Sequence, residues 1–311
     1  MRAVELIRLI KEIGRGKNAA RDLNRDDARA LFTAMLAGEV ADLQLGAVLI
    51  ALRIKGESLD ELAGFLEACE ACYPHLTAPV VANGAVPVVI PAYNGARQLP
   101  NLTPLLAQLI AREGVPVLVQ GVMRDAGRVS TCEVFEAMGI TPARSRDDAQ
   151  TQLAARNLAF MSLDVLAPPL ARVLALRREI GVRSSGHTLA KMLQPFATPA
   201  VRLVSVTHPD YLKRMREFFT RHASGALLLR GAEGEAVAHP RREPALEWCE
   251  GGTSQTWTAA AEVDPALPES RDAAATAAWI AEVLAGTRAA PAAIGHQVRC
   301  CVRAAQPPGN K

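Results

Sequence analysis

The chain has 311 residues, half of them hydrophobic, so it is long enough for two domains around substantial cores, and its composition excludes extensive disorder. Aromatic residues make up only 4% and the formal net charge is +3, so any contact with a polyanion would depend on local charge more than on base stacking. No segment approaches the roughly 20 apolar residues of a membrane span, and residues 1–13 are charged rather than signal-like. We therefore expect a cytoplasmic protein without a membrane segment.

Residues 1–75 have the apolar spacing of a small helical bundle. Asn24 begins a helix that ends at Gly38, and Asp42 is expected to cap the next helix. Ser58 begins a third helix, because Ser58-Leu-Asp-Glu61 fits a capping box. We expect helices around residues 165–195 to join this bundle.

Residues 80–303 alternate between short apolar runs and helical segments, which predicts an α/β domain with a largely parallel sheet. The pattern weakens beyond Arg242, and residues 304–311 are expected to form a flexible tail. Strands are expected at residues 86–90, 115–119, 203–206 and 226–229, and helices at residues 102–112, 131–138 and 209–222. The predicted fold is thus a small N-terminal helical bundle joined to a larger α/β domain.

Charge is distributed unevenly along the chain. Residues 170–222 carry ten basic and three acidic side chains, whereas residues 243–285 carry eight acidic side chains and only Arg271 as a base. Such asymmetry can make one face attractive to polyanions. Residues 213–221 can equally be read as the solvated face of a surface helix.

Cysteine and histidine do not suggest a catalytic or metal site. Cys69 and Cys72 form one CxxC pair without a second pair, and Cys300 and Cys301 are adjacent, so we expect buried or half-buried thiols. The spacing supports no Ser-His-Asp or Cys-His arrangement, and we assign His187 a structural role. We expect no catalytic residue, no metal and no cofactor.

Three segments resemble a known family. Gln44-Leu-Gly-Ala-Val-Leu-Ile-Ala-Leu-Arg-Ile-Lys-Gly-Glu57 resembles the helical signature of anthranilate phosphoribosyltransferases and pyrimidine nucleoside phosphorylases, and Arg177-Arg-Glu-Ile-Gly-Val-Arg183 resembles their second signature. The strand that ends at His208-Pro209 matches the next part of the pattern. The resemblance spans about residues 5–285 and implies a phosphoribosyltransferase/nucleoside phosphorylase-like fold, but fold alone does not establish chemistry.

The resemblance fails where the family holds its phosphoribosyl donor. The glycine-rich diphosphate loop falls on Pro91-Ala-Tyr-Asn-Gly-Ala96, where side chains and a proline replace glycines. The Lys-His-Gly-Asn-Arg segment falls on Val119-Gln-Gly-Val-Met123 and keeps only Gly121, and the family's serine pair falls on Ala126-Gly127. Its acidic magnesium pair falls on Ala236 and Val237, although Glu233 or Glu235 could partly substitute. We expect the parent activity to be lost.

Basic residues lie in or beside these altered segments. With Ile90-Pro-Ala-Tyr-Asn-Gly-Ala-Arg97 and His187-Thr-Leu-Ala-Lys191, they resemble the YbiB-type branch of the anthranilate phosphoribosyltransferase-like, glycosyltransferase family 3 proteins. That resemblance implies a homodimer, formed through the N-terminal helices, that binds DNA and RNA with little sequence preference. The candidate contacts are Arg15, Lys17, Arg97, Arg124, Arg128, Arg177, Arg178, Arg183 and Lys191. Each of these can also be an ordinary surface charge or salt bridge.

The sequence therefore favours a nucleic-acid-binding protein that uses a basic interdomain cleft to contact backbone phosphates. The alternative is a phosphoribosyl- or glycosyltransferase with a remodelled donor site. Residual phosphate contacts would then come from Asn94, Gly95, Asn101 and Thr103, together with Arg97 and Arg128, and a cation would be held by Glu233 and Glu235. A third interpretation is a module that binds an acidic protein.

Overall fold

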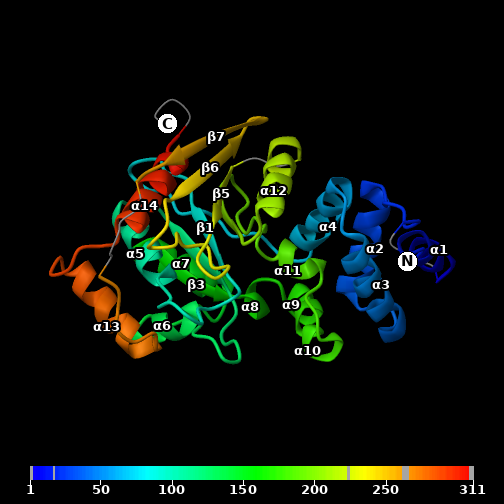
Figure 1. Ribbon diagram of the computed structural model, residues 1–311, viewed down its shortest axis with the longest axis horizontal. Coiled ribbons are helices and arrows are strands. Elements are labelled where there is room, and N and C mark those ends of the chain that lie inside the picture. Colours follow the sequence, from blue (N-terminus) through cyan, green and yellow to red (C-terminus); the bar gives the residue numbers. More distant parts are fainter. Residues whose placement is uncertain (1–2, 17, 223–224, 261–265, 308–311) are drawn as a thin grey trace. The chain divides into compact units, whose positions relative to one another are not determined.

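The computed structural model describes residues 3–16, 18–222, 225–260 and 266–307. The chain forms two compact units: unit 1 comprises residues 1–74 and 167–193, and unit 2 comprises residues 75–166 and 194–311. Figure 1 shows the helices of unit 1 and the twisted sheet of unit 2. A helical bundle and an α/β domain with a largely parallel sheet confirm the predicted fold class.

Unit 1 is helical throughout its described secondary structure. Helices α2 and α4 pack closely, with the Phe32 and Phe65 rings 4.9 Å apart. The helices are α1 (Ala3–Ile13), α2 (Arg25–Ala37), α3 (Asp42–Lys55), α4 (Leu59–Ala71), α9 (Pro168–Ala175), α10 (Arg177–Ile180) and α11 (Ser185–Leu189).

Local capping explains where these helices begin. The Asn24 side chain accepts the Asp27 amide proton at 2.8 Å, and Ser58 and Glu61 form the predicted reciprocal capping box. Asp42 is not the cap that its position suggested: Ala41 is the N-cap residue, and Asp42 is the first helical residue, where its charge faces the positive end of the helix dipole.

Unit 2 is built on a seven-stranded sheet, within the described residues, in the order β3-β2-β1-β4-β5-β6-β7. Strands β1 to β5 pair in parallel, and β6 and β7 form an antiparallel hairpin at one edge. The strands are β1 (Val88–Ala92), β2 (Val117–Gly121), β3 (Leu158–Ser162), β4 (Val201–Val206), β5 (Ala226–Arg230), β6 (Ala245–Glu250) and β7 (Thr253–Thr258).

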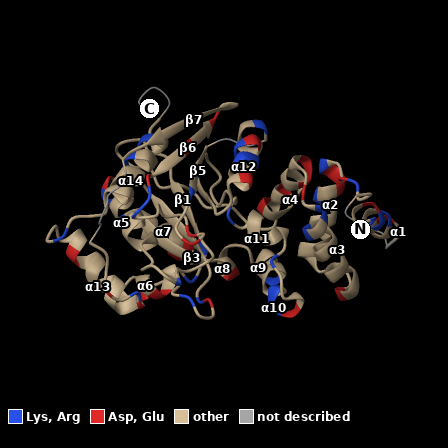
Figure 2. Ribbon diagram, in the orientation of Figure 1, with Lys and Arg blue, Asp and Glu red and all other residues tan. Residues whose placement is uncertain are grey.

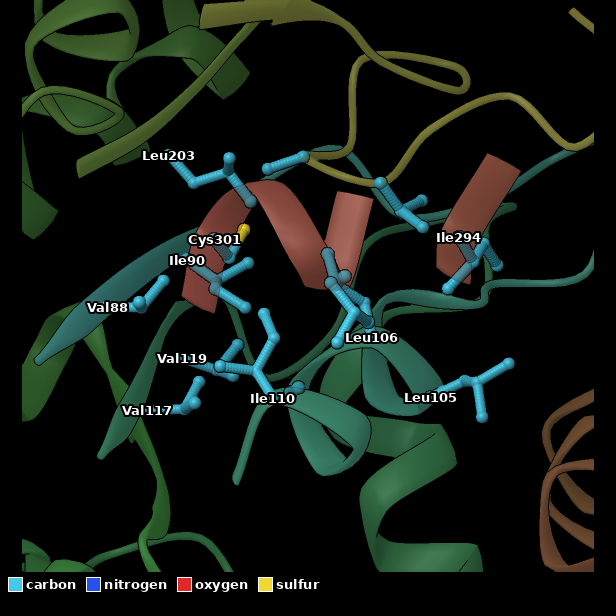
Figure 3. Packing of buried hydrophobic residues seen from close by; sticks show 14 of the residues in the cluster. Val88, Ile90, Leu105, Leu106, Ile110, Val117, Val119, Leu203, Ile294 and Cys301 are labelled. Carbon is cyan, nitrogen blue, oxygen red and sulfur yellow. The ribbon is translucent and has the colours of Figure 1, made fainter. Parts of the chain in front are cut away.

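Helices pack on this sheet through one apolar core. Val88 and Ile90 of β1 lie against Leu106 and Ile110 of α5, with Cys301 of α14 beside them (Figure 3). Fully buried strands with apolar residues on both faces are typical of parallel sheets covered by helices. The helices are α5 (Thr103–Arg112), α6 (Thr131–Ala137), α7 (Arg146–Arg156), α8 (Leu163–Leu166), α12 (Pro209–Arg221), α13 (Ala273–Leu284) and α14 (Ala292–Ala305).

Strand β1 departs from its prediction at a proline. We expected Pro91 to end the strand, but β1 continues to Ala92. Its pairing with β4 covers only Val88 and Val89, so the missing amide proton of Pro91 falls beyond that ladder.

The chain beyond Arg242 has more regular secondary structure than predicted, and α14 includes Ala304 and Ala305, which are buried although we expected a tail there. Among the described residues, no helix is long and apolar enough to cross a membrane.

Candidate functional site

The candidate site in unit 2 lies where the order of the sheet reverses. Strand β1 has β2 on one side and β4 on the other, so successive strands are added in opposite directions from this point. In open parallel sheets, ligands bind beyond the carboxyl ends of the strands at such a position. The loops after β1 (residues 93–102), β2 (122–130) and β5 (231–244) meet here.

The loop after β5 turns sharply at Glu233 and Gly234. The Glu235 amide donates to the Ala232 carbonyl at 2.9 Å, and φ is +54° at Glu233 and +90° at Gly234, as in a type I′ turn. A side chain at position 234 would meet Asn94 Nδ2 at 2.5 Å, so the turn requires glycine there. Glu233 holds a left-handed conformation that glutamate rarely adopts, so the surrounding contacts must maintain it.

This turn directs two carboxylates at backbone amides of the loop after β1. Glu235 is only 1% exposed, and its Oε1 accepts from the amides of Asn94 at 2.6 Å and Gly95 at 2.7 Å. Its Oε2 accepts from the Thr131 hydroxyl at 3.3 Å. The Glu233 carboxylate accepts from three consecutive amides, those of Arg97 at 2.8 Å, Gln98 at 2.9 Å and Leu99 at 3.2 Å.

Polar side chains predicted as residual phosphate contacts hold the same loops together. Asn94 donates its side-chain amide to the Gly234 carbonyl, and Asn101 donates to the Val129 carbonyl and the Thr131 hydroxyl, both at 3.1 Å. The Thr103 hydroxyl is buried without a hydrogen-bond partner among the described residues. Asn94, Gly95, Asn101 and Thr103 thus lie in one constellation, and their donors are largely engaged within the protein.

Three of the predicted basic contacts lie in these loops. Arg124 pairs with Glu136 at 2.5 Å and with Glu133 at 3.8 Å, so its charge is largely neutralised, and the hydrogen bond with Glu136 raises its pKa. Arg128 donates to the Gly95 carbonyl at 3.4 Å. Arg97 is exposed, and its side chain makes no ion pair with any residue that the structure describes.

Two family models match the chain. One, for the helical bundle domain of a glycosyl transferase family, matches residues 7–71, and the other, for its a/b domain, matches residues 95–262. The chain belongs to this glycosyl transferase family. The uncharacterized protein YbiB of Escherichia coli (strain K12) is 47% identical over 95% of this chain and 92% of its own length.

The chain is also similar to anthranilate phosphoribosyltransferases, in sequence and in fold. The enzyme of Sinorhizobium medicae (strain WSM419) is 30% identical over 70% of this chain and 64% of its own length. The anthranilate phosphoribosyltransferase of Thermus thermophilus covers 97% of this chain and 88% of its own, with a TM-score of 0.75 and 22% identity. The Saccharomyces cerevisiae enzyme, solved with PRPP and Mg, has a TM-score of 0.74 at 13% identity over 97% of this chain and 89% of its own. At these low identities, the structural likeness shows the fold.

In this chain, the positions that the resemblance assigns to magnesium ligands carry residues that cannot bind the ion. Ala236 and Val237 stand at the expected acidic pair, and both belong to the apolar core, 0% and 3% exposed. The carboxylates of Glu233 and Glu235, which we considered as substitutes, accept backbone amides instead. In the described part of the chain, no three His, Cys, Asp or Glu side chains cluster as metal ligands would.

The remaining predicted contacts belong to unit 1. Arg177 and Arg178 of α10 are exposed, and neither makes an ion pair with a described residue. In Figure 2 the ribbon of this helix is blue where its basic residues lie. The Arg183 carbonyl accepts from Arg53 at 2.8 Å, and Lys191 is half-buried. Arg15 forms an ion pair with Glu12 at 2.6 Å, which reduces its availability, and Lys17 lies outside the described residues.

The His187 side chain lies near several of these cations. Burial, and then the nearby charges of Arg183, Arg177 and Lys191, lower its pKa to about 4. Its Nδ1 accepts the Ser184 amide at 3.3 Å in the cap of α11, which requires the neutral ring.

The lowered pKa of His187 predicts an acid-sensitive unit 1. Because its folded value lies below the ordinary 6.5, the unfolded chain binds the proton more readily, and stability is lost as the pH falls from 6.5 towards 4. We expect the melting temperature to fall less between pH 7 and 5 in His187→Gln, which can retain the capping acceptor. Thermal unfolding of both proteins across this range tests it; parallel curves would contradict the assigned pKa.

Sequence reasoning missed the main feature of the site. The resemblance suggests Glu233 and Glu235 as partial replacements for metal ligands, whereas in the structure they accept hydrogen bonds from the loop amides. The only available signal was the Glu-Gly pair within Gly231-Ala-Glu-Gly-Glu235, where glycine after an acidic residue suggests a tight turn. Nothing in the sequence indicated which amides would face that turn.

Proposed function

We propose that this chain binds nucleic acid through backbone phosphates, without reading the bases, on a phosphoribosyltransferase-like scaffold. One observation carries the proposal: Arg97, Arg177 and Arg178 are exposed and form no ion pair with a described residue. In addition, the carboxylates of Glu233 and Glu235 accept the amides of the loop after β1, where the family holds its phosphoribosyl donor. An unpaired, exposed guanidinium is free to form bidentate contacts with a phosphate. Because carboxylates of the chain occupy these amides, the loop is poorly suited to a phosphoribosyl donor, which argues against phosphoribosyl transfer as the principal activity.

We propose further that the protein acts as a homodimer through unit 1. Leu43, Ala47, Ile50 and Ile54 follow one another along α3 at spacings of four, three and four residues, the spacing of a helix–helix seam. Leu43 is 88% exposed and Ile54 is 60% exposed, which is unusual for residues of this size unless a partner covers them. A two-fold dimer would present each set of arginines twice to one polyanion.

The test is binding of a labelled DNA oligonucleotide by fluorescence polarisation across a salt series. We expect affinity to fall with salt and the combined variant Arg97→Gln/Arg177→Gln/Arg178→Gln to lose most of it, with the salt slope reduced by about 0.9 for each phosphate contact removed. The charge-matched control, Arg8→Gln/Arg221→Gln/Arg288→Gln, removes three arginines that are already paired, with Asp27, Glu217 and Glu282, and should change little. Sedimentation of the same samples measures whether the protein is a dimer in solution.

Two results would overturn this proposal. One is the absence of DNA and RNA binding at low salt by the folded protein, and the other is equal binding by the arginine variant and its control. A salt-sensitive complex with an acidic protein alone would favour the protein-interaction module.

The second candidate function is a glycosyl- or phosphoribosyltransferase with a remodelled donor site. The family membership and the similarity to anthranilate phosphoribosyltransferases favour it. Asn94, Asn101 and Thr103 would then contact a phosphate, with Arg97 and Arg128 nearby. Binding of phosphoribosyl diphosphate by the unaltered chain, measured by calorimetry with and without magnesium, would favour this function over the first.

A further inference from the structure

We propose that the loop after β1 is an anion-binding site whose ligand belongs to the chain itself: the carboxylates of Glu233 and Glu235 occupy backbone amides that would otherwise bind a phosphate or diphosphate group. The turn at residues 232–235 therefore acts as an internal, competing ligand. This inference concerns unit 2 alone, so it stands or falls independently of nucleic-acid binding.

The contacts of Glu235 are those of a bound oxyanion. Its carboxylate is 1% exposed, and a charge so deeply buried is tolerated only when several donors compensate for its lost hydration. The amides of Asn94 and Gly95 and the hydroxyl of Thr131 supply those donors, from two different loops. Hydrogen bonds to an ionised acceptor are stronger than neutral ones, so the turn is held firmly in the loop.

Glu233 occupies a second set of donors in the same loop. Three consecutive amides, at residues 97, 98 and 99, converge on its carboxylate, and converging successive amides form the type of concavity that binds anions in proteins. Glu233 has φ +54°, a conformation that is unfavourable for a side chain with a Cβ. An unfavourable backbone conformation at the residue that fills the concavity supports the view that the contact maintains the turn.

An external phosphate cannot share this site. Each backbone amide has one proton, and five amides of the loop already donate to the two carboxylates. A phosphate placed beside them would also meet two like charges in a partly buried environment, where repulsion is stronger than in water. Removing the carboxylates therefore removes both the competition and the repulsion.

The experiment titrates inorganic pyrophosphate into the full chain and into Glu233→Gly and Glu235→Ala, singly and together, by isothermal titration calorimetry. Glycine at 233 suits the positive φ, so that variant loses the carboxylate while keeping the turn. We expect the double variant to bind pyrophosphate at least about tenfold more tightly than the unaltered chain. The charge-matched control, Glu113→Gln/Asp147→Asn, removes two exposed carboxylates of unit 2 outside the loop and should bind as the unaltered chain does.

Amide resonances provide a second readout that does not depend on the double variant. In Glu233→Gly, the amide protons of Gln98 and Leu99 should shift upfield when the carboxylate is lost and move back when pyrophosphate is added. The proposal is overturned if the unaltered chain binds pyrophosphate as tightly as the variants, or if a folded Glu233→Gly shows neither the shift nor the binding. Loss of nucleic-acid binding alone would leave these results unchanged and would count only against the proposed function.

Discussion

Replacing Glu61 with alanine is expected to reduce the stability of unit 1 by about 3–5 kcal/mol, the range measured when one member of a buried ion pair is removed. Glu61 is 0% exposed and accepts the amides of Leu23 at 2.9 Å and Ser58 at 2.7 Å, and the Lys55 ammonium at 2.6 Å. The change leaves Lys55, whose side chain is 6% exposed, with Asp22 as its remaining carboxylate partner. Urea unfolding followed by circular dichroism measures the loss.

Two further variants separate the parts of this network. Ser58→Ala removes the reciprocal cap and should cost about 1 kcal/mol. Glu61→Gln keeps an acceptor for the backbone amides but loses the charge opposite Lys55, so it should fall between the other two. A Glu61→Ala protein as stable as Ser58→Ala would show that the buried pair contributes nothing beyond the cap.

This network illustrates what the sequence predicts and what it does not. Ser58-Leu-Asp-Glu61 predicted the helix start correctly, because a capping box is formed by residues three positions apart. The contacts of Glu61 with Leu23 and Lys55 depend on tertiary packing, which brings the end of the α1–α2 connection to α4. The same distinction holds only in part for unit 2: apolar runs predicted β2 and β5, whereas the polar, largely exposed β7 was not predicted. The buried strands β3 and β6 were not predicted either.

The candidate site divides in the same way. Aligning the chain with the family's motifs located the altered loops, and the structure brings Asn94, Asn101 and Arg128 together there. The alignment could not reveal that Glu235 is directed into the loop, because the partners are more than 130 residues apart and joined only through the order of the strands. Nor could it show that Arg124 and Arg15 would pair with acidic neighbours, whereas Arg177 and Arg178 form no ion pair with a residue that the structure describes.

The contacts of Glu233 show how the amides of the loop after β1 are satisfied in this chain. If the loop had simply lost its phosphate contacts, its amides would be open to water or to any passing anion. Instead, the turn at residues 232–235 satisfies them with the chain's own carboxylates, so these amides have acceptors within the protein. The negative charge of these carboxylates would repel the phosphates of a polyanion locally, so contacts with nucleic acid would depend on exposed arginine side chains, as proposed for Arg97, Arg177 and Arg178.

Replacing Gly121 with alanine is expected to destabilise unit 2 by about 3 kcal/mol or more, since overpacking between two backbones at the centre of a sheet cannot be relieved by a rotamer change. A Cβ at this position would lie 1.9 Å from the Ala92 carbonyl oxygen and 2.7 Å from its carbon, where β1 and β2 end side by side. Gly121 is the one residue kept from the family's Lys-His-Gly-Asn-Arg segment, and this close contact explains, without any phosphate, why glycine is needed here.

Gly295→Ala in α14 is the control: its Cβ would meet only the Arg299 side chain at 3.6 Å, and it should stabilise the helix by about 0.5–1 kcal/mol. A Gly121→Ala protein with unchanged urea unfolding would contradict this structural role.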